Sequence, residues 1–275
     1  MKLISVNDLS LQNEGYFAFK HVAFSLSQNE IIGINGDNGS GKTQLLDAIA
    51  EYRTPDSGQI DYTPGVRMGY LPQNDPQVVD QTVAKYLEDT RRLSKKLAVR
   101  KEQLQAMITF LGMSPYLDHQ VQQLSIGLRR RVDFLAAVSG HPNVLLLDEP
   151  FAFQSSKTVD NMMNLMQDLK DNGSGIIVAG TNFDNNLKHN FDSNYLLKDN
   201  SLTKIQSITN AESKTLLVFG VNPNSIAITS DIEKYIISNR NNLIEMEIPL
   251  ALKTVLLEKM TRLNYHFEEA RNLEN

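Results

Sequence analysis

Apolar residues along this chain gather in short runs that alternate with amphipathic stretches, a pattern typical of alternating strands and helices. Residues 31–34, 144–147 and 176–179 are almost entirely apolar, as expected for strands buried on both faces of a parallel sheet. Residues 45–50 carry apolar side chains at helical spacing. From residue 31 onward the alternation therefore predicts an α/β fold with a parallel-sheet core.

Segments around this core have a different pattern. Residues 2–6 and 21–26 are strand-like and enclose a polar turn, which predicts a hairpin or a small N-terminal antiparallel sheet. Residues from about 80 to 123 are charged and helical in spacing, and their basic cluster is most simply a solvated helix face; a role near anionic lipid headgroups is the alternative. Two later strand-like runs flank Asp199-Asn200, a dipeptide that favours a hairpin turn.

The composition turns polar near residues 207–214, and we expect a domain boundary there. This divides the chain into a first domain, residues 1–210, and a small C-terminal α+β appendage, residues 211–275. No group of residues in the appendage has the spacing of a catalytic site. Its pattern predicts strands at 215–219, 225–229 and 243–248 and helices at 231–239 and 250–263.

The composition excludes several classes of protein. The 275 residues include no cysteine, which rules out a disulfide framework and a thiolate metal site. No apolar run approaches the roughly 18 to 20 residues that span a bilayer, and the first residues are too polar for a secretory signal. These features predict a cytoplasmic protein. The formal net charge of −5 argues against a nucleic-acid binder, which is usually basic.

Residues 36–43, Gly-Asp-Asn-Gly-Ser-Gly-Lys-Thr, fit the phosphate-binding pattern G-x-x-x-x-G-K-[ST] without a mismatch. They lie between a predicted strand and a predicted helix, where free backbone N–H groups and the helix dipole favour a polyphosphate. Lys42 would meet the β and γ phosphates, and Thr43 would offer its hydroxyl to magnesium. The alternative is a glycine-rich turn before a helix. The residues expected to contact the nucleotide here are Gly36, Asp37, Asn38, Gly39, Ser40, Gly41, Lys42, Thr43 and Gln44.

Two carboxylates, Asp148 and Glu149, directly follow the apolar run 144–147. A buried strand that ends in Asp-Glu places both side chains near the phosphate-binding loop of a neighbouring strand. Asp148 would hold magnesium through water, and Glu149 would polarise the attacking water or accept its proton. The alternative is an ordinary strand end that turns at Pro150.

With these two motifs, residues 1 to about 206 resemble the nucleotide-binding subunit of an ATP-binding-cassette (ABC) transporter. Residues 69–73, Gly-Tyr-Leu-Pro-Gln, are similar to the family's Q-loop, and residues 124–131, Leu-Ser-Ile-Gly-Leu-Arg-Arg-Arg, to its signature. The resemblance implies that Gln73 contacts magnesium and the attacking water. It also implies that Ser125 and the amide of Gly127 contact the γ-phosphate held by an opposite subunit.

The same resemblance implies an aromatic residue that stacks on the adenine base. An aromatic residue upstream of the phosphate loop commonly stacks on the base in this family. Tyr16 is the nearest candidate and Phe17 the second. Either aromatic ring could instead pack in the core or lie on a strand face.

The resemblance implies the fold of a P-loop NTPase ABC cassette, in which residues from about 80 to 123 correspond to the helical subdomain. It also implies an ATPase that binds ATP and Mg²⁺. Such a subunit works as a homodimer or as a heterodimer with a second ATP-binding subunit. It drives a membrane-spanning permease subunit from the cytoplasmic face of the membrane. Export is the expected direction, because the signature has the aliphatic Ile126 and the chain has a C-terminal appendage. The alternative is a soluble ABC-type regulatory or assembly protein with weak hydrolysis and no transport role.

Three positions depart from the family pattern. Thr181-Asn182 stands where the family has Thr-His or Ser-His, so Asn182 replaces the switch histidine. Asparagine donates a hydrogen bond but carries no charge, and losing one charge-stabilising donor costs about 10²- to 10³-fold in rate. Ser155 occupies the position of the D-loop aspartate, and Gln44 that of a second hydroxyl residue. These departures predict slow hydrolysis at this subunit's own site.

Overall fold

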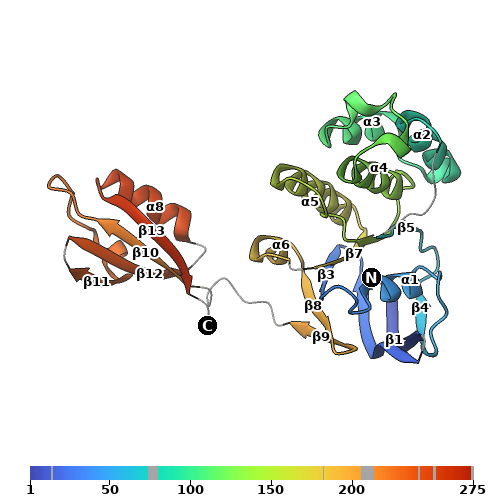
Figure 1. The fold of residues 1–275 in the computed structure, drawn as a ribbon, viewed down its shortest axis with the longest axis horizontal. Coiled ribbons are helices and arrows are strands. Elements are labelled where there is room, and N and C mark those ends of the chain that lie inside the picture. The colour runs from blue at the N-terminus through green and yellow to red at the C-terminus, as the bar shows by residue number, and fades with distance from the viewer. Residues whose placement is uncertain are drawn as a thin grey trace. The chain divides into compact units, whose positions relative to one another are not determined.

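The chain divides into two compact units, Met1–Ile205 and Gln206–Asn275, and each is described by itself. Figure 1 shows the elements of both units. The structure is a computed structural model that describes residues 1–13, 15–73, 80–181, 183–205, 214–240, 242–249 and 252–273.

A six-stranded sheet forms the centre of the first unit, with the order β5-β6-β7-β3-β8-β9. All neighbouring strands are parallel except the last pair, β8 and β9, which is antiparallel. The positive φ angles of Asp199 (49°) and Asn200 (62°) suit the predicted two-residue hairpin between β8 and β9. The strands are β3 (Glu30–Asn35), β5 (Met68–Leu71), β6 (Val144–Asp148), β7 (Gly175–Gly180), β8 (Ser193–Lys198) and β9 (Ser201–Ile205).

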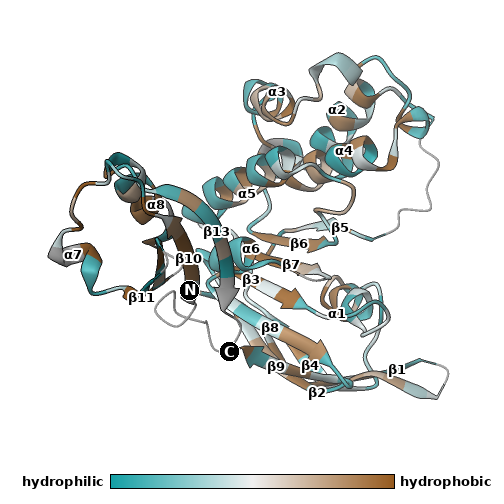
Figure 2. Ribbon diagram, turned by 60° about the vertical axis from the view of Figure 1, so that its left-hand side comes forward, coloured by the Kyte–Doolittle hydropathy of each residue, from teal (hydrophilic) through white to brown (hydrophobic). Residues whose placement is uncertain are grey.

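This sheet is buried on both faces, which explains the continuous apolar runs of the sequence. Successive side chains of a strand point to opposite faces, so Ile31 of β3 enters one hydrophobic core and Ile32 the other. β6 divides in the same way, with Leu145 in the first core and Leu146 in the second. In Figure 2, β6 and β7 are coloured toward the hydrophobic end of the scale.

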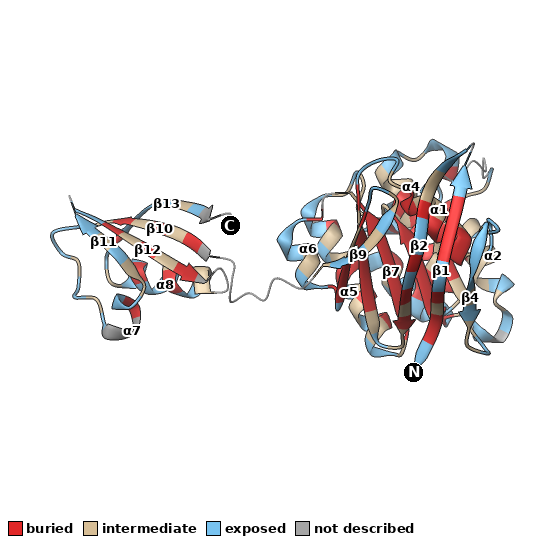
Figure 3. Ribbon diagram, turned by 90° about the horizontal axis from the view of Figure 1, so that it is seen from below, coloured by how far each residue is buried: buried red, intermediate tan, exposed pale blue. Residues whose placement is uncertain are grey.

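One of the two cores is closed by a second sheet and by helix α1 (Lys42–Ile49). This sheet is antiparallel, with the order β2-β1-β4, and it confirms the predicted N-terminal antiparallel sheet. Figure 3 colours much of β7 and α1 as buried. The turn was expected to include Glu14, which lies outside the described residues. The strands are β1 (Lys2–Asn13), β2 (Tyr16–Ser27) and β4 (Ser57–Tyr62).

Helices cover the other core, and α2 and α3 lie within the range, about residues 80–123, where a helical subdomain is expected. Val83 and Leu87 of α2 and Leu104 of α3 contribute to this core. The helices are α2 (Val83–Leu93), α3 (Lys101–Phe110), α4 (Ile126–Ser139), α5 (Ser156–Asp171) and α6 (Asn185–His189), and the short 3₁₀ turns are Lys95–Leu97, Ser114–Tyr116 and Val121–Gln123.

The C-terminal unit is a βαββαβ domain with a core that includes Leu217, Phe219, Met246 and Met260. Its antiparallel sheet has the order β11-β12-β10-β13, the order of a ferredoxin-like fold. Its elements are β10 (Lys214–Gly220), α7 (Ser230–Glu233), β11 (Ile236–Arg240), β12 (Leu243–Pro249), α8 (Lys253–Arg262) and β13 (His266–Leu273).

Two predictions for this unit were wrong, and one strand was missed. Residues 225–229 form no strand, because the chain after α8 holds them: Ile226 N–H donates to the Leu263 carbonyl and Tyr265 to the Ile226 carbonyl. The helix predicted at 231–239 ends after one turn, and β11 follows because its residues pair with β12. Strand β13 was not predicted, because its charged, exposed residues show no apolar alternation.

Candidate nucleotide-binding site

The glycine-rich segment 36–43 leaves β3 and enters α1, and its path depends on glycine at two positions. Gly41 is the N-cap of α1 with a φ of 103°, and Gly39 has a φ of 81°. L-residues rarely adopt such angles. A Cβ at position 41 would also lie 2.5 Å from the carbonyl oxygen of Ala18 in β2. The loop therefore packs directly against the N-terminal sheet.

Lys42 carries the positive charge of the loop, and its side chain is only 6% exposed. Its ammonium donates hydrogen bonds to the carbonyls of Gly36 (2.7 Å) and Asp37 (2.9 Å) and lies 3.9 Å from the Glu149 carboxylate. Burial lowers the pKa of Lys42, and the nearby Glu149 opposes that shift. A buried cation at a helix N-terminus favours an anionic ligand.

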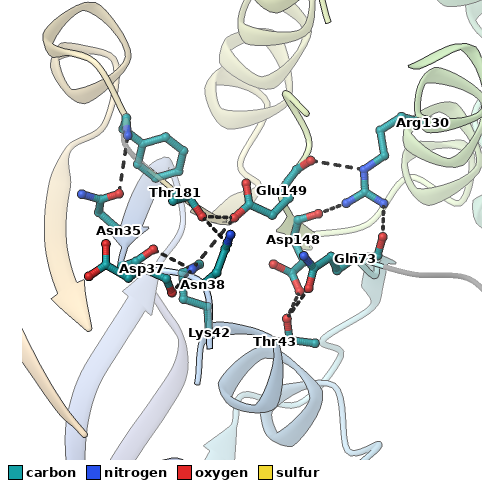
Figure 4. A network of polar contacts seen from close by, with 12 residues as sticks. Asn35, Asp37, Asn38, Lys42, Thr43, Gln73, Arg130, Asp148, Glu149 and Thr181 are labelled. Atoms are coloured by element: carbon teal, nitrogen blue, oxygen red, sulfur yellow. Dashed lines mark hydrogen bonds and ion pairs between the residues drawn. The ribbon is translucent and has the colours of Figure 1, made fainter. Parts of the chain in front are cut away.

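Thr43, Gln73 and Asp148 meet beside the loop (Figure 4). The Thr43 hydroxyl lies 2.6 Å from Asp148 Oδ2 and 3.1 Å from Gln73 Oε1. Asp148 is fully buried. Burial raises the pKa of Asp148, and the neighbouring Glu149 adds to the effect, while the Thr43 hydrogen bond opposes it. Three oxygen donors of this kind are the ligands that Mg²⁺ prefers.

Two buried oxygens in this region lack a partner. Among the described residues, only four buried side-chain polar atoms have no hydrogen bond, and two of them are Ser40 Oγ and Asp148 Oδ1. Buried polar atoms are normally paired, so two such atoms in one site need an explanation. A bound cation at Asp148 and an anion at the loop would satisfy both. The residues present therefore fit MgATP.

Glu149 is held in place by the carboxyl end of strand β7. Its backbone has a φ of 50°, and its N–H donates to the Ala179 carbonyl of β7 at 2.8 Å. The Thr181 hydroxyl, just after β7, lies 2.6 Å from Glu149 Oε1 and 3.2 Å from Asn38 Oδ1. The strained backbone aims the carboxylate at the loop rather than along the strand. Asn182, predicted to replace the switch histidine, lies outside the described residues.

The sheet order corrects one detail of the sequence interpretation. Asp148 and Glu149 were expected to follow a strand next to β3, but β7 lies between β3 and β6. The two motifs still meet, because the carboxyl ends of these parallel strands lie at one edge of the sheet. Thr181, directly after the intervening strand β7, also belongs to the site, although the sequence motifs did not predict it. A correct prediction of the strand order would have placed Thr181 beside Glu149.

The signature segment, Ser125 to Arg131, begins helix α4. Ser125 is the exposed N-cap, and its hydroxyl accepts the Leu128 N–H at 3.4 Å. Gly127 packs against the segment after β6: a Cβ there would lie 2.6 Å from the Phe153 carbonyl, and the Gln154 amide donates to the Gly127 carbonyl at 2.8 Å. The signature and the D-loop are thus in direct contact.

Other predicted positions have simple local surroundings. Ser155, in place of the D-loop aspartate, caps α5 by accepting the Thr158 N–H at 3.4 Å. Gln44 is half-buried in the first turn of α1. Tyr16 is 82% exposed at the start of β2, so a planar ligand can reach its ring, while the Phe17 ring lies 3.9 Å from Lys20 Nζ.

Within the part of the chain that the structure describes, every helix is too short or too polar to cross a membrane.

The parallel sheet and the glycine-rich loop between β3 and α1 define a nucleotide-binding domain of the P-loop class. The sequence pattern of the ABC transporter family matches residues 19–152. Residues 19–152 are therefore an ABC transporter domain, and the fold is that of an ATP-binding cassette.

Relatives of both import and export systems are similar to the chain. The zinc import ATP-binding protein ZnuC of Jannaschia sp. (strain CCS1) is 37% identical over 149 residues, which make up 54% of this chain and 60% of ZnuC. The lipopolysaccharide export system ATP-binding protein LptB of Haemophilus influenzae (strain ATCC 51907 / DSM 11121 / KW20 / Rd) is 28% identical over 206 residues, 70% of this chain and 84% of LptB. The chain thus spans only about 60% of the length of the zinc import relative.

The fold also matches solved cassettes. The dimeric structure of the bacterial ABC transporter cassette MJ0796 superposes with a TM-score of 0.65 at 21% identity. The match covers 75% of this chain and all of that cassette.

Proposed function

We propose that this chain is an ATP-binding subunit that binds and hydrolyses MgATP in a dimer to drive a separate membrane subunit. The observation that carries the proposal is the meeting of Thr43, Gln73 and Asp148 beside a loop whose buried Lys42 faces Glu149. These side chains come from three separate parts of the sequence. Together they supply a cation for phosphate, oxygen donors for magnesium and a carboxylate for water.

Each side chain has a role that follows from its surroundings. Lys42 exchanges one of its hydrogen bonds to a loop carbonyl for a bond to a phosphate oxygen. The positive charge that binds the phosphate is therefore already in the site before the nucleotide arrives. Thr43 and Asp148 hold Mg²⁺, with Gln73 beside them, and the cation neutralises charge on the phosphates when it is bound. Glu149 orients the attacking water and accepts its proton.

Thr181 holds Glu149 in the position for this reaction. Its hydroxyl lies 2.6 Å from the carboxylate, and that contact does not depend on a switch histidine. Asn182 supplies at most an uncharged amide next to the same strand end. Hydrolysis by this site is therefore expected to be slow.

Dimerisation is the part of the proposal that completes the site. Ser125 and Gly127 lie at the N-terminus of α4, where a helix dipole and free N–H groups favour the γ-phosphate of a second subunit. Ile126 (64% exposed) and Phe153 (76% exposed) flank this position and would be covered by the partner. The second subunit is another copy of this chain or a different ATP-binding subunit.

A groove of about 420 Å³ beside the helical subdomain supports a membrane partner. It runs between the end of β5, at Tyr70 and Pro72, and α2. Leu93 (81% exposed) and Tyr52 (73% exposed) lie on its rim. A groove with both apolar and polar lining residues fits a short amphipathic helix of a membrane-spanning subunit, which would hold the chain at the cytoplasmic face of the membrane.

Export is the proposed direction. The similar proteins include both an import and an export ATP-binding protein, so they do not decide the direction. The proposal therefore rests on Ile126 of the signature and on the C-terminal unit. Reconstitution with the permease subunit in vesicles of known orientation tests the direction.

The proposed function is tested with the purified chain and ATP. Glu149→Gln should abolish hydrolysis and retain bound ATP, whereas the exposed control Glu102→Gln should match the unchanged protein. Hydrolysis by Glu149→Gln at the original rate would remove Glu149 from its role. A stand-alone homodimer that turns over tens of ATP per second would contradict the slow-site proposal.

Fractionation of cells tests the transport role. Recovery with the membrane, together with a subunit of several apolar helices, supports it. Recovery with a soluble partner alone would favour the regulatory or assembly role instead.

A further inference from the structure

Arg130, in the second turn of α4, touches the carboxyl ends of both β5 and β6. Its guanidinium donates to the carbonyl oxygens of Pro72 (2.5 Å) and Gln73 (3.2 Å) after β5. It also donates to the carbonyls of Glu149 (3.2 Å) and Asp148 at the end of β6. Figure 4 shows this fork between the two strand ends. One side chain therefore bonds the backbone of both Gln73 and Glu149.

The environment of Arg130 is unusual for a cation. The side chain is only 7% exposed, and within the described residues the four groups that accept its hydrogen bonds are backbone carbonyls. Burial lowers its pKa, while Asp133, Asp148 and Glu149 oppose the shift. A buried cation is costly unless its donors are satisfied, and the planar guanidinium has enough N–H groups to reach four acceptors at once.

Arg130 lies on α4 between Ser125 at the start of the helix and Asp133 at the groove, so its hydrogen bonds link both places to the strand ends. Ser125, at the N-terminus of the same helix, lies five residues away, roughly 7.5 Å along the axis at 1.5 Å per residue. Asp133, one turn further along, lines the groove beside the helical subdomain, as does Pro72. A rigid helix thus connects the dimer-facing surface and the groove to the two strand ends.

We propose that Arg130 is a positioning residue that fixes Gln73 and Glu149 relative to α4, so that any movement of this helix resets both side chains together. This inference rests on the proposed function, because Gln73 and Glu149 act together only if the site hydrolyses MgATP. Among the described residues, Arg130 does not contact the phosphate-binding loop at residues 36–43. It acts through its hydrogen bonds to the backbone carbonyls of Gln73 and Glu149.

The test compares Arg130→Lys and Arg130→Met with Arg67→Lys in the full chain. Lysine keeps the charge but offers its donors at one point, so it cannot span both strand ends. We expect Arg130→Lys to lower kcat for MgATP about 10- to 100-fold and to change the Kd for ATP less than about threefold, because small misplacement of reacting groups affects rate more than binding. Arg130→Met should lower kcat further, since it removes every donor.

A second readout needs no nucleotide. Amide hydrogen exchange should accelerate at least about tenfold in peptides that end at residues 73 and 149 when Arg130 becomes lysine, because the strand ends open locally. Arg67→Lys is the matched control. Arg67 donates to the His141 carbonyl at 3.1 Å, at the amino ends of the same two strands. Its replacement should leave kcat within about threefold, since those ends lie away from the reacting groups.

Each outcome decides the inference. Arg130→Lys with unchanged kcat and unchanged exchange at both strand ends would overturn it and leave the proposed function intact. An equal fall in kcat for Arg67→Lys would show a general loss of fold stability and would also overturn it. If Arg130→Met does not fold, the lysine variant carries the test. If the unchanged chain hydrolyses no ATP, the proposed function fails, and the exchange measurement alone still shows whether Arg130 holds the strand ends.

Discussion

Replacing Asp148 by asparagine should have opposite effects on folding and on nucleotide binding. The carboxylate is fully buried, with one oxygen 2.6 Å from Thr43 and the other without a partner among the described residues. Asparagine has the same shape but no charge. It removes the cost of burying a carboxylate and also the charge that would hold a cation.

The loss in binding can be estimated from these contacts. A hydrogen bond to a charged group contributes about 1.5–3 kcal/mol. A carboxylate about 4 Å from a cation gains about 4 kcal/mol per unit charge at an effective dielectric constant of 20, much of it offset by desolvation. A net loss of about 2–4 kcal/mol corresponds to a fall of about 30- to 1,000-fold in Mg²⁺-dependent ATP affinity. ATP affinity without Mg²⁺ should change little.

The effect on folding has a definite sign and pH window. The pKa of Asp148 is raised in the folded protein above its ordinary value of 3.8. Between the ordinary pKa and the raised pKa, the folded state keeps a proton on Asp148 that the unfolded state has lost. The free energy of unfolding therefore falls as the pH rises through this range. Asparagine does not titrate. Asp148→Asn should therefore be at least as stable as the unchanged nucleotide-free protein at neutral pH, and less stable relative to it at acidic pH.

Thermal unfolding and calorimetric titration with ATP, with and without Mg²⁺, measure both effects. Asp61→Asn, an exposed carboxylate on β4, is the control and should behave like the unchanged protein in MgATP binding. Full Mg²⁺-dependent binding by Asp148→Asn would refute the reasoning. So would a large loss of nucleotide-free stability at neutral pH.

Three further changes test other parts of the structure. Gly41→Ala should lower stability by about 1–3 kcal/mol and abolish ATP binding, because its Cβ would collide with β2 at a φ of 103°. Gly65→Ala is the control, because a Cβ there meets nothing within 4 Å, and it should keep ATP binding. Calorimetric titration with ATP compares the two variants. Thr181→Val removes the hydroxyl 2.6 Å from Glu149 and should lower kcat about tenfold with ATP affinity kept, as steady-state kinetics would show. Phe219→Ala, in the core of the C-terminal unit, should destabilise that unit by about 3–5 kcal/mol in denaturant unfolding and leave ATP binding by the first unit unchanged.

The strands of the central sheet were predictable because burial on both faces leaves a continuous apolar run in the sequence. The segment 144–147 shows this, since its residues alternate between two cores and none faces solvent. β13 lacks such a run, and its residues become a strand only through pairing with β10. Charged, exposed edge strands of this kind have little signal of their own.

The candidate site divides in the same way. The loop at 36–43 and the pair Asp148-Glu149 were predictable because phosphate and metal chemistry restrict the residue types. Arg130 was not, because its partners are backbone carbonyls, which leave no mark on the residue types at positions 72, 73, 148 and 149. Thr181 was adjacent to a motif position, but its contact with Glu149 follows from the strand order.

Calorimetric titration of the full chain with MgATP tests the central claim most directly, with Lys42→Ala beside it. The account predicts one ATP per chain, binding that weakens when Mg²⁺ is removed, and no measurable binding by Lys42→Ala, whose loop loses its buried cation. Equal binding by Lys42→Ala and the unchanged chain, or no binding of MgATP by the unchanged chain at millimolar concentration, would contradict it.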